Sequence, residues 1–259
     1  MLLLFLFVAA TCLLLNLQAH DAYTTASPPP RLHVVTVVTD PMHPKLQLLK
    51  NTAKKHGLDI HVMVSPKPFG HAVAAFGVKQ LMFYDLLKSG TLPADDIVML
   101  VDGYDLIINA SEAELLRRFH RFRHDIVFAA ELFCSPDQHR DKDYASRKPH
   151  VAPPYRYLNC GAFMGKVSAL KQLYDDYSDR MSEEMDDQRV MTSIYLETNR
   201  IVLDARCSIF WCLVGADGHA ELTDRGWKNT ETQTYPAVFH ANGPLVVKDV
   251  LFEKMYPHM

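Results

Sequence analysis

The feature of this sequence that most constrains its fold is a regular alternation of short apolar runs and longer amphipathic segments from residue 32 onward. The apolar runs predict strands at 33–39, 60–65, 97–101, 126–130 and 158–165, two short strands within 201–214 and a last strand at 237–240. The amphipathic segments predict helices at 45–56, 78–88, 112–122, 168–177 and 187–197, and the polar, proline-containing segment 134–157 is expected to be a long loop. Strands that alternate with helices indicate an α/β fold with a mostly parallel central sheet and flanking helices.

The ends of this pattern predict the domain organisation. Residues 2–15 are uncharged and apolar, and a polar stretch follows them, so residues 1–19 are expected to be a signal peptide or an uncleaved signal anchor. Residues 20–31 then form a linker, and residues 32–259 form a single domain, for which a chain of 259 residues with 48% hydrophobic residues is long and apolar enough. We therefore expect the domain in the lumen of the secretory pathway, in the endoplasmic reticulum or Golgi, or outside the cell, with a membrane contact only through such an anchor.

The cysteines are compatible with that compartment without proving it. Cys12 lies in the apolar leader, and Cys134, Cys160, Cys207 and Cys212 have no spacing typical of a zinc site. Buried free thiols and one or two disulfides fit this pattern equally well.

Composition and missing motifs exclude several functions. With 27 Lys and Arg against 30 Asp and Glu, the net charge is −3, so the sequence lacks the basic excess typical of nucleic-acid-binding proteins. No G-x-G-x-x-G follows the first strand, segment 161–166 is one residue short of a P-loop, and no G-x-S-x-G occurs. Dinucleotide-dependent redox, ATPase and serine-hydrolase chemistry are therefore disfavoured.

Three groups of polar residues are candidates for chemistry. Asp102 and Asp105 directly follow the most apolar strand, where two carboxylates suit a divalent ion that also binds phosphates, although a solvated acidic turn has the same pattern. Asp186 and Asp187 begin a predicted helix, where carboxylates also serve as N-terminal caps. His240 follows the last strand, and a neutral imidazole there could complete the coordination of the ion.

Taken together, these residues resemble the glycosyltransferase domain of the multifunctional procollagen lysyl hydroxylases and its free-standing relatives. The matching pieces, in order along the chain, are the first strand ending at Thr39, Val101-Asp102-Gly103-Tyr104-Asp105, 128–134 with Glu131, 156–163 with Asn159, Asp186-Asp187-Gln188 and His240-Ala241-Asn242-Gly243-Pro244. The resemblance implies a GT-A-like Rossmann-type fold, a UDP-sugar donor, Mn²⁺ and transfer with retention of the sugar's configuration. The activity that the resemblance favours is glucosyl transfer onto galactosylhydroxylysine of a collagen-like acceptor.

The resemblance also assigns roles to particular residues. It implies that Mn²⁺ is held by Asp102, Asp105 and His240, that Thr39 and Tyr104 contact the uridine, and that Lys79, Asn242 and Gly243 contact the diphosphate. It places Asp186, Asp187 and Asn159 at the reacting sugar and the acceptor.

Two departures from the family pattern concern the acceptor. Ser135 stands where collagen-modifying members carry Trp, and Val246 stands where a basic residue is expected, with Lys248 nearby. Transfer of galactose from UDP-galactose to hydroxylysine, or transfer to a non-collagen acceptor, therefore stays open. A metal-dependent phosphohydrolase and an inactive nucleotide-sugar-binding module are the alternatives from other classes.

Overall fold

The computed structural model describes residues 28–66, 76–148, 151–152, 154–243 and 253–255. The chain divides into two compact units, Met1–Pro30 and Arg31–Met259, and the described helices and strands all lie in the second. The expected leader at 1–19, most of the linker at 20–31, and the positions of Val246 and Lys248 lie outside the described residues.

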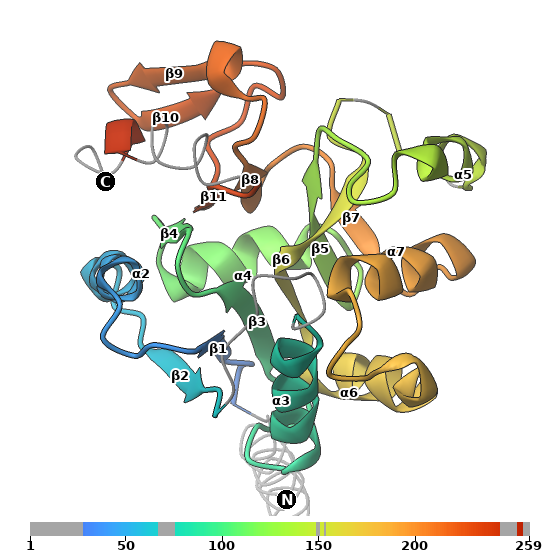
Figure 1. Cartoon of the computed structure of the whole chain (residues 1–259). Coiled ribbons are helices and arrows are strands. Elements are labelled where there is room, and N and C mark those ends of the chain that lie inside the picture. The colour runs from blue at the N-terminus through green and yellow to red at the C-terminus, as the bar shows by residue number, and fades with distance from the viewer. Residues whose placement is uncertain (1–27, 67–75, 149–150, 153, 244–252, 256–259) are drawn as a thin grey trace, which may run out of the picture. The chain divides into compact units, whose positions relative to one another are not determined.

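A six-stranded sheet forms the centre of this unit (Figure 1). Its strands, in spatial order, are β2 (Ile60–Val64), β1 (Leu32–Val38), β3 (Ile97–Asp102), β6 (Tyr157–Lys166), β5 (Ile126–Glu131) and β7 (Val202–Asp204). Only β6 runs antiparallel to its neighbours β3 and β5; the other pairings are parallel. The predicted α/β fold with a mostly parallel sheet is therefore confirmed.

Helices cover both faces of the sheet. The described α-helices are α2 (Pro44–Lys55), α3 (Gly77–Lys88), α4 (Glu112–His120), α5 (Asp141–Ser146), α6 (Val167–Asp176) and α7 (Asp187–Glu197), with 3-10 turns at Gln138–Arg140, Ser178–Arg180 and Asp217–His219. Because side chains alternate along a strand, Val35 and Val37 of β1 pack into the core shared with α3, α6 and α7, whereas Val34 and Val38 pack into the core shared with α2 and α4. The two cores are thus separated by the sheet.

A smaller sheet and a hairpin complete the unit. The small sheet has the order β4 (Leu106–Ile108), β11 (Val238–His240), β8 (Phe210–Cys212), and the hairpin pairs β9 (Ala220–Thr223) with β10 (Gly226–Asn229). The sequence patterns did not predict β4 or the hairpin, because runs of three or four residues carry too little periodicity. The expectation of a loop over 134–157 was wrong in part, since α5 and a 3-10 turn lie inside it.

Two local features bring functional segments to one edge of the central sheet. The last pair in the β1–β3 ladder places Val37 opposite Asp102, so Asp102 stands at the carboxyl end of β3. The β5–β6 register shifts between Phe128 and Ala129, whose partners on β6 are Phe163 and Asn159. Such an irregularity re-aims the strand locally, and here it inserts the residues after Asn159 beside the end of β3.

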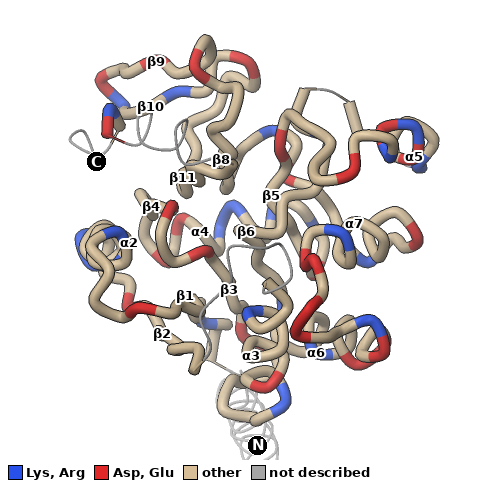
Figure 2. The backbone as a smooth tube through the Cα atoms, in the orientation of Figure 1, with Lys and Arg blue, Asp and Glu red and all other residues tan. Residues whose placement is uncertain are grey.

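Charges are mixed rather than separated over the helices. Lys and Arg positions are interspersed with Asp and Glu positions along α5 and α6 (Figure 2). This distribution agrees with the small net charge and gives these helices no single-sign face.

Candidate active site

A cavity of about 590 Å³ lies at the carboxyl end of β3. It is lined by side chains from segments far apart in the sequence, including Lys79, Asp102, Tyr104, Asp105, Asn159, Cys160, Gly161, Asp186, Asp187, Gln188, His240, Asn242 and Gly243. Every residue that the sequence analysis proposed for the site lines this cavity except Thr39. The fold therefore brings together the acidic turn, the start of α7 and the segment after β11.

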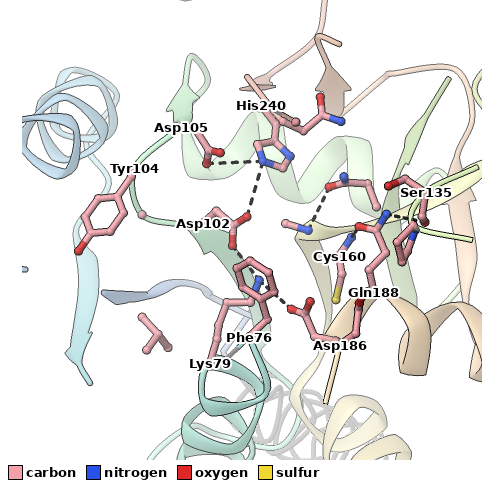
Figure 3. Close-up of a pocket in the computed structure, with 18 of the residues that line it drawn as sticks. Phe76, Lys79, Asp102, Tyr104, Asp105, Ser135, Cys160, Asp186, Gln188 and His240 are labelled. Atoms are coloured by element: carbon pink, nitrogen blue, oxygen red, sulfur yellow. Dashed lines mark hydrogen bonds and ion pairs between the residues drawn. The ribbon is translucent and has the colours of Figure 1, made fainter. Parts of the chain in front are cut away.

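Asp102, Asp105 and His240 form a cluster that could hold one metal ion. His240 Nε2 lies 3.7 Å from Asp102 Oδ2 and 3.5 Å from Asp105 Oδ1, and one ligand atom from each of the three residues lies within 4.8 Å of the others (Figure 3). The buried Cys212 sulfur is 3.9 Å from Nδ1, so Nε2 is the imidazole nitrogen that faces the carboxylates. Two carboxylates and one imidazole suit a divalent ion of intermediate hardness such as Mn²⁺.

The backbone of β6 forms one wall of this cluster. A Cβ atom built on Gly161 would lie 2.2 Å from His240 Cε1 and 2.6 Å from Asp102 Oδ2, closer than any side chain tolerates. Glycine is therefore required for this close approach, because any larger residue at position 161 would displace His240 or Asp102.

Lys79 links the metal cluster to the acidic start of α7. Its buried ammonium lies 2.8 Å from Asp102 Oδ1 and 3.0 Å from Asp187 Oδ2. Burial alone would lower the pKa of Lys79, but the two carboxylates outweigh it and raise the pKa well above its usual value. Burial raises the pKa of Asp102, and Lys79 opposes that rise. Lys79 thus occupies Oδ1 of Asp102, while Oδ2 faces His240.

The two aspartates at the start of α7 have different roles in the structure. Asp186 is the N-cap of the helix and accepts a hydrogen bond of 3.0 Å from the backbone N–H of Arg189. Asp187 is 5% exposed, and Gln80 Nε2 donates to its Oδ2 over 3.0 Å. Tyr174 in turn donates to the Oε1 of Gln80. Asp187 is therefore the aspartate whose orientation is fixed by buried residues of α3 and α6.

Tyr104 and Thr39 contact each other at the side of the cavity away from α7. The backbone N–H groups of Thr39 and Asp40 donate to the Tyr104 hydroxyl over 2.9 and 2.7 Å, and the ring centroid of His43 lies 4.4 Å from that of Tyr104. Figure 3 shows the Tyr104 ring directed away from the metal cluster. This geometry ties the end of β1 to the acidic turn.

Glu131 accepts hydrogen bonds from three side-chain amides, and it was not among the site residues expected from the sequence. Its Oε1 accepts hydrogen bonds from the side-chain amides of Asn159 (3.3 Å) and Gln188 (2.7 Å), and its Oε2 accepts from Asn242 (2.9 Å). Burial raises the pKa of Glu131 to about 7, although these hydrogen bonds and His240 oppose the rise. One carboxyl group therefore connects β5, β6, α7 and the segment after β11.

Each amide bound to Glu131 also accepts a backbone hydrogen bond. The side-chain carbonyl oxygens of Asn159, Gln188 and Asn242 accept from the N–H groups of Gly161, Cys160 and Val214, respectively. The amide orientations follow from this network, because an ionised carboxylate has no hydrogen to donate and can bind an amide only through its NH2 group. A glutamate at the end of a buried strand, quoted within the run 128–134, was the signal available in the sequence.

Comparison with known proteins establishes the family. The family model described as the PLOD GT domain matches residues 28–252. The chain belongs to this family. The matching curated relatives include the multifunctional procollagen lysine hydroxylase and glycosyltransferase of Caenorhabditis elegans, which is 31% identical over 85% of this chain and 32% of its own length. Procollagen-lysine,2-oxoglutarate 5-dioxygenase 1 of mouse is 30% identical over 68% of this chain and 24% of its own length. The chain thus spans a third or less of these two relatives.

A solved structure supports the fold assigned to this PLOD GT domain. A glycosyltransferase involved in glycosylating the major capsid of PBCV-1 superposes with a TM-score of 0.51 at 10% sequence identity, covering 87% of this chain and all of the other. At such low identity the similarity concerns the fold alone. The predicted GT-A-like fold, the predicted family and the prediction of a glycosyltransferase are therefore confirmed.

The described residues contain no disulfide and no membrane-spanning helix. Cys134, Cys160, Cys207 and Cys212 are free thiols, which answers for these four the question left open by the sequence. Within the described part of the chain, which excludes the first 27 residues, no helix is both long and apolar enough to cross a bilayer.

Proposed function

We propose that this PLOD GT domain is an Mn²⁺-dependent glycosyltransferase that transfers glucose from UDP-glucose to galactosylhydroxylysine of a collagen-like acceptor. The observation that carries the proposal is the convergence of Asp102, Asp105 and His240 on one point of a cavity that also contains Asp187 and Asn242. A nucleotide diphosphate would bind at the metal cluster, and the sugar attached to it would lie in the adjoining part of the cavity that contains Asp187.

The residues present fit a divalent ion, since one ligand atom from each of the three residues lies within 4.8 Å of the others. Asp102, Asp105 and His240 would hold Mn²⁺. The ion, when bound, would neutralise charge that develops on the departing diphosphate.

The rest of the donor would bind to the residues around this cluster. Tyr104 offers an aromatic surface for the uracil, with Thr39 holding its hydroxyl. Asn242 and Gly243 border the cavity after β11, beside the metal ligands, and are proposed to contact the diphosphate. Lys79, whose ammonium lies between Asp102 and Asp187, is proposed to contact the diphosphate and to add a positive charge beside it.

The sugar and the acceptor are proposed to meet beside the start of α7. Asp187 is held by Lys79 and Gln80, so its carboxylate keeps one orientation, in which it can bind donor hydroxyls or stabilise positive charge at the anomeric carbon. Asp186 and Asn159 line the same cavity. Fixed dipoles and charges of this kind lower the barrier because they need no reorganisation during the reaction. The family resemblance favours retention of configuration at that carbon.

One observation supports keeping a second acceptor in view. Ser135 lines the cavity at the position where collagen-modifying relatives are expected to carry Trp, and its backbone oxygen accepts from Gln188. A small side chain there leaves a different acceptor surface. Galactosyl transfer to hydroxylysine, or transfer to a non-collagen acceptor, is therefore the alternative activity. For either activity we propose a site of action in the secretory lumen, on the strength of the apolar leader.

The test is an assay of UDP release by the full chain with a panel of UDP-sugars, with and without Mn²⁺. Three acceptors are compared: a collagen peptide bearing galactosylhydroxylysine, the same peptide bearing hydroxylysine, and an unmodified lysine peptide. The proposal requires Mn²⁺-dependent release that is highest with UDP-glucose and the first peptide. UDP-galactose with the second peptide would support the alternative, and UDP binding without release from any pair would indicate a binding module.

A further inference from the structure

A second pocket, formed by α4, the β7–β8 connection, the β9–β10 turn and the segment before β11, is lined by five arginines. It has a volume of about 480 Å³ and shares no residue with the cavity described above. The arginines are Arg117, Arg118, Arg121, Arg206 and Arg225, and the carboxylates in the lining are Glu114 and Asp204. Such an excess of positive charge stands out in a chain whose net charge is −3.

The carboxylates of this pocket are already engaged. Glu114 is bound by Arg117 and Arg118, at N–O distances of 2.5 and 2.7 Å. Asp204 is fully buried, and its oxygens accept from the backbone N–H groups of Ser208, Ile209 and Phe210. Neither carboxylate neutralises the remaining three arginines.

Arg121, Arg206 and Arg225 are exposed, and within the described part of the chain none of them pairs with a carboxylate. Arg206 donates to the backbone oxygen of Thr232 over 3.1 Å, which fixes one end of its guanidinium and leaves its other N–H groups available. Arg225 lies over the ring of Tyr235, 4.4 Å from its centroid. Two of these guanidinium groups, those of Arg206 and Arg225, are thus held at the pocket by uncharged partners, and Arg121 lines the same depression.

We propose that this pocket binds a ligand that carries two or more phosphate or sulfate groups. Guanidinium groups bind such oxyanions through paired N–H donors, and several of them around one concavity discriminate against single charges. The partly buried rings of Phe122 and Tyr235 add an apolar wall of the kind found in small-ligand sites, and the volume lies in the range typical of such sites. This inference does not depend on the proposed donor or acceptor.

The test is titration of the chain with two probes, inorganic tripolyphosphate and a sulfated heparin hexasaccharide, in EDTA to remove any metal-dependent binding at the first cavity. The pocket variant carries Arg121→Glu and Arg206→Glu. The control carries Lys171→Glu and Arg180→Glu, which make the same change in net charge outside the pocket; Lys171 is half-buried and pairs with Asp175, and Arg180 is exposed and pairs with Glu197. Thermal unfolding checks that each variant folds, and Arg121→Gln with Arg206→Gln replaces the reversal if it does not.

We expect the pocket variant to bind at least about 100-fold more weakly, since each charged contact contributes about tenfold or more, while the control stays within about threefold of the wild type. Binding of tripolyphosphate alone would identify phosphate groups as the ligand, and binding of the hexasaccharide alone would identify sulfate groups. The proposal is overturned if the wild type binds neither probe, if the pocket variant binds as the wild type does, or if the control loses as much affinity.

Discussion

At the scale of single residues, Asp187 is distinguished from its neighbour by what holds it. Asp186 is occupied as a helix cap, whereas Asp187 accepts from Gln80 and pairs with Lys79 inside the cavity. Both aspartates line the cavity, but Asp186 caps α7 whereas Asp187 is held by a buried lysine and a buried glutamine, a difference that the sequence alone left open.

Replacing Asp187 should separate transfer from donor binding. We expect Asp187→Asn to lower kcat for transfer by about 100-fold or more, because a fixed charge beside the sugar is lost, while UDP affinity stays within about threefold. Activity assays and UDP titration by calorimetry measure the two quantities. If UDP affinity falls as far as kcat does, Asp187 acts only by holding Lys79, and its proposed role at the sugar is wrong.

Gly161 should be irreplaceable for a steric reason. An added Cβ would have to displace His240 or Asp102, so we expect Gly161→Ala to weaken Mn²⁺-dependent UDP binding at least about tenfold and to cost about 1–3 kcal/mol of unfolding free energy. Gly218→Ala is the matched control, since nothing lies within 4 Å of its Cβ position. Wild-type UDP affinity in Gly161→Ala would show that the cluster does not need the arrangement seen here.

At the scale of elements, the Glu131 network joins segments that the chain delivers separately. It fixes the irregular part of β6, the first turn of α7 and the segment after β11 through one carboxyl group. Three amide side chains bound to one buried carboxyl group hold these segments in fixed positions relative to one another. The stability of the fold then depends on whether Glu131 is protonated.

The raised pKa of Glu131 determines the sign of that dependence. With a pKa of about 7 in the fold and about 4.5 in the unfolded chain, the folded state binds more protons between these values. The contribution of Glu131 to stability is therefore fully present below pH 4.5 and is lost as the pH rises through 7, by about 3 kcal/mol in total.

Glu131→Gln should remove the pH dependence of stability that comes from Glu131, because glutamine does not titrate. Urea unfolding at about pH 4.5, 6 and 8 is expected to show a shallower loss of stability in the variant than in the wild type over this interval. The variant should also be less stable at low pH, because one amide loses its acceptor. Glu221→Gln, at an exposed site, is the control. Parallel pH profiles for wild type and Glu131→Gln would contradict the prediction.

At the scale of the whole molecule, the proposed metal site connects two sheets. Asp102 ends β3 of the central sheet, whereas His240 ends β11 of the small sheet, and Asp105 lies just before β4. The backbone N–H of Ala241 also donates to the carbonyl of Asp105 over 2.8 Å, so the two sheets already meet at this point. Binding of an ion would add a link between them.

We therefore expect Mn²⁺ to raise the Tm of the chain, because an ion that binds only the folded state stabilises it by mass action. Asp102→Asn should abolish this shift and the Mn²⁺-dependent binding of UDP, while the metal-free Tm stays close to that of the wild type, since the introduced amide oxygen can still accept from Lys79. Asp95→Asn, at an exposed site paired with Lys166, is the control. An undiminished shift in Asp102→Asn would place the ion elsewhere.

The order of most strands and helices, the family and half of the residues that line the cavity could be predicted from the sequence. Local periodicity and the short motifs at strand ends carry that information along the chain, as the helix at 187–197 and the pair Asp102 and Asp105 show. The exceptions in the fold are short: β4, the β9–β10 hairpin and α5 have too few residues for a periodic signal.

Only the tertiary structure decided how those pieces meet. Nothing local marks Lys79 as the bridge between Asp102 and Asp187, Glu131 as the acceptor for three amides, or Gly161 as the wall beside His240, because each depends on contacts between residues distant in sequence. The arginine pocket arises in the same way, from α4, one inter-strand connection and one turn. A sequence determines what each segment tends to form, whereas the packing of segments determines which side chains share a charge, a hydrogen bond or a space.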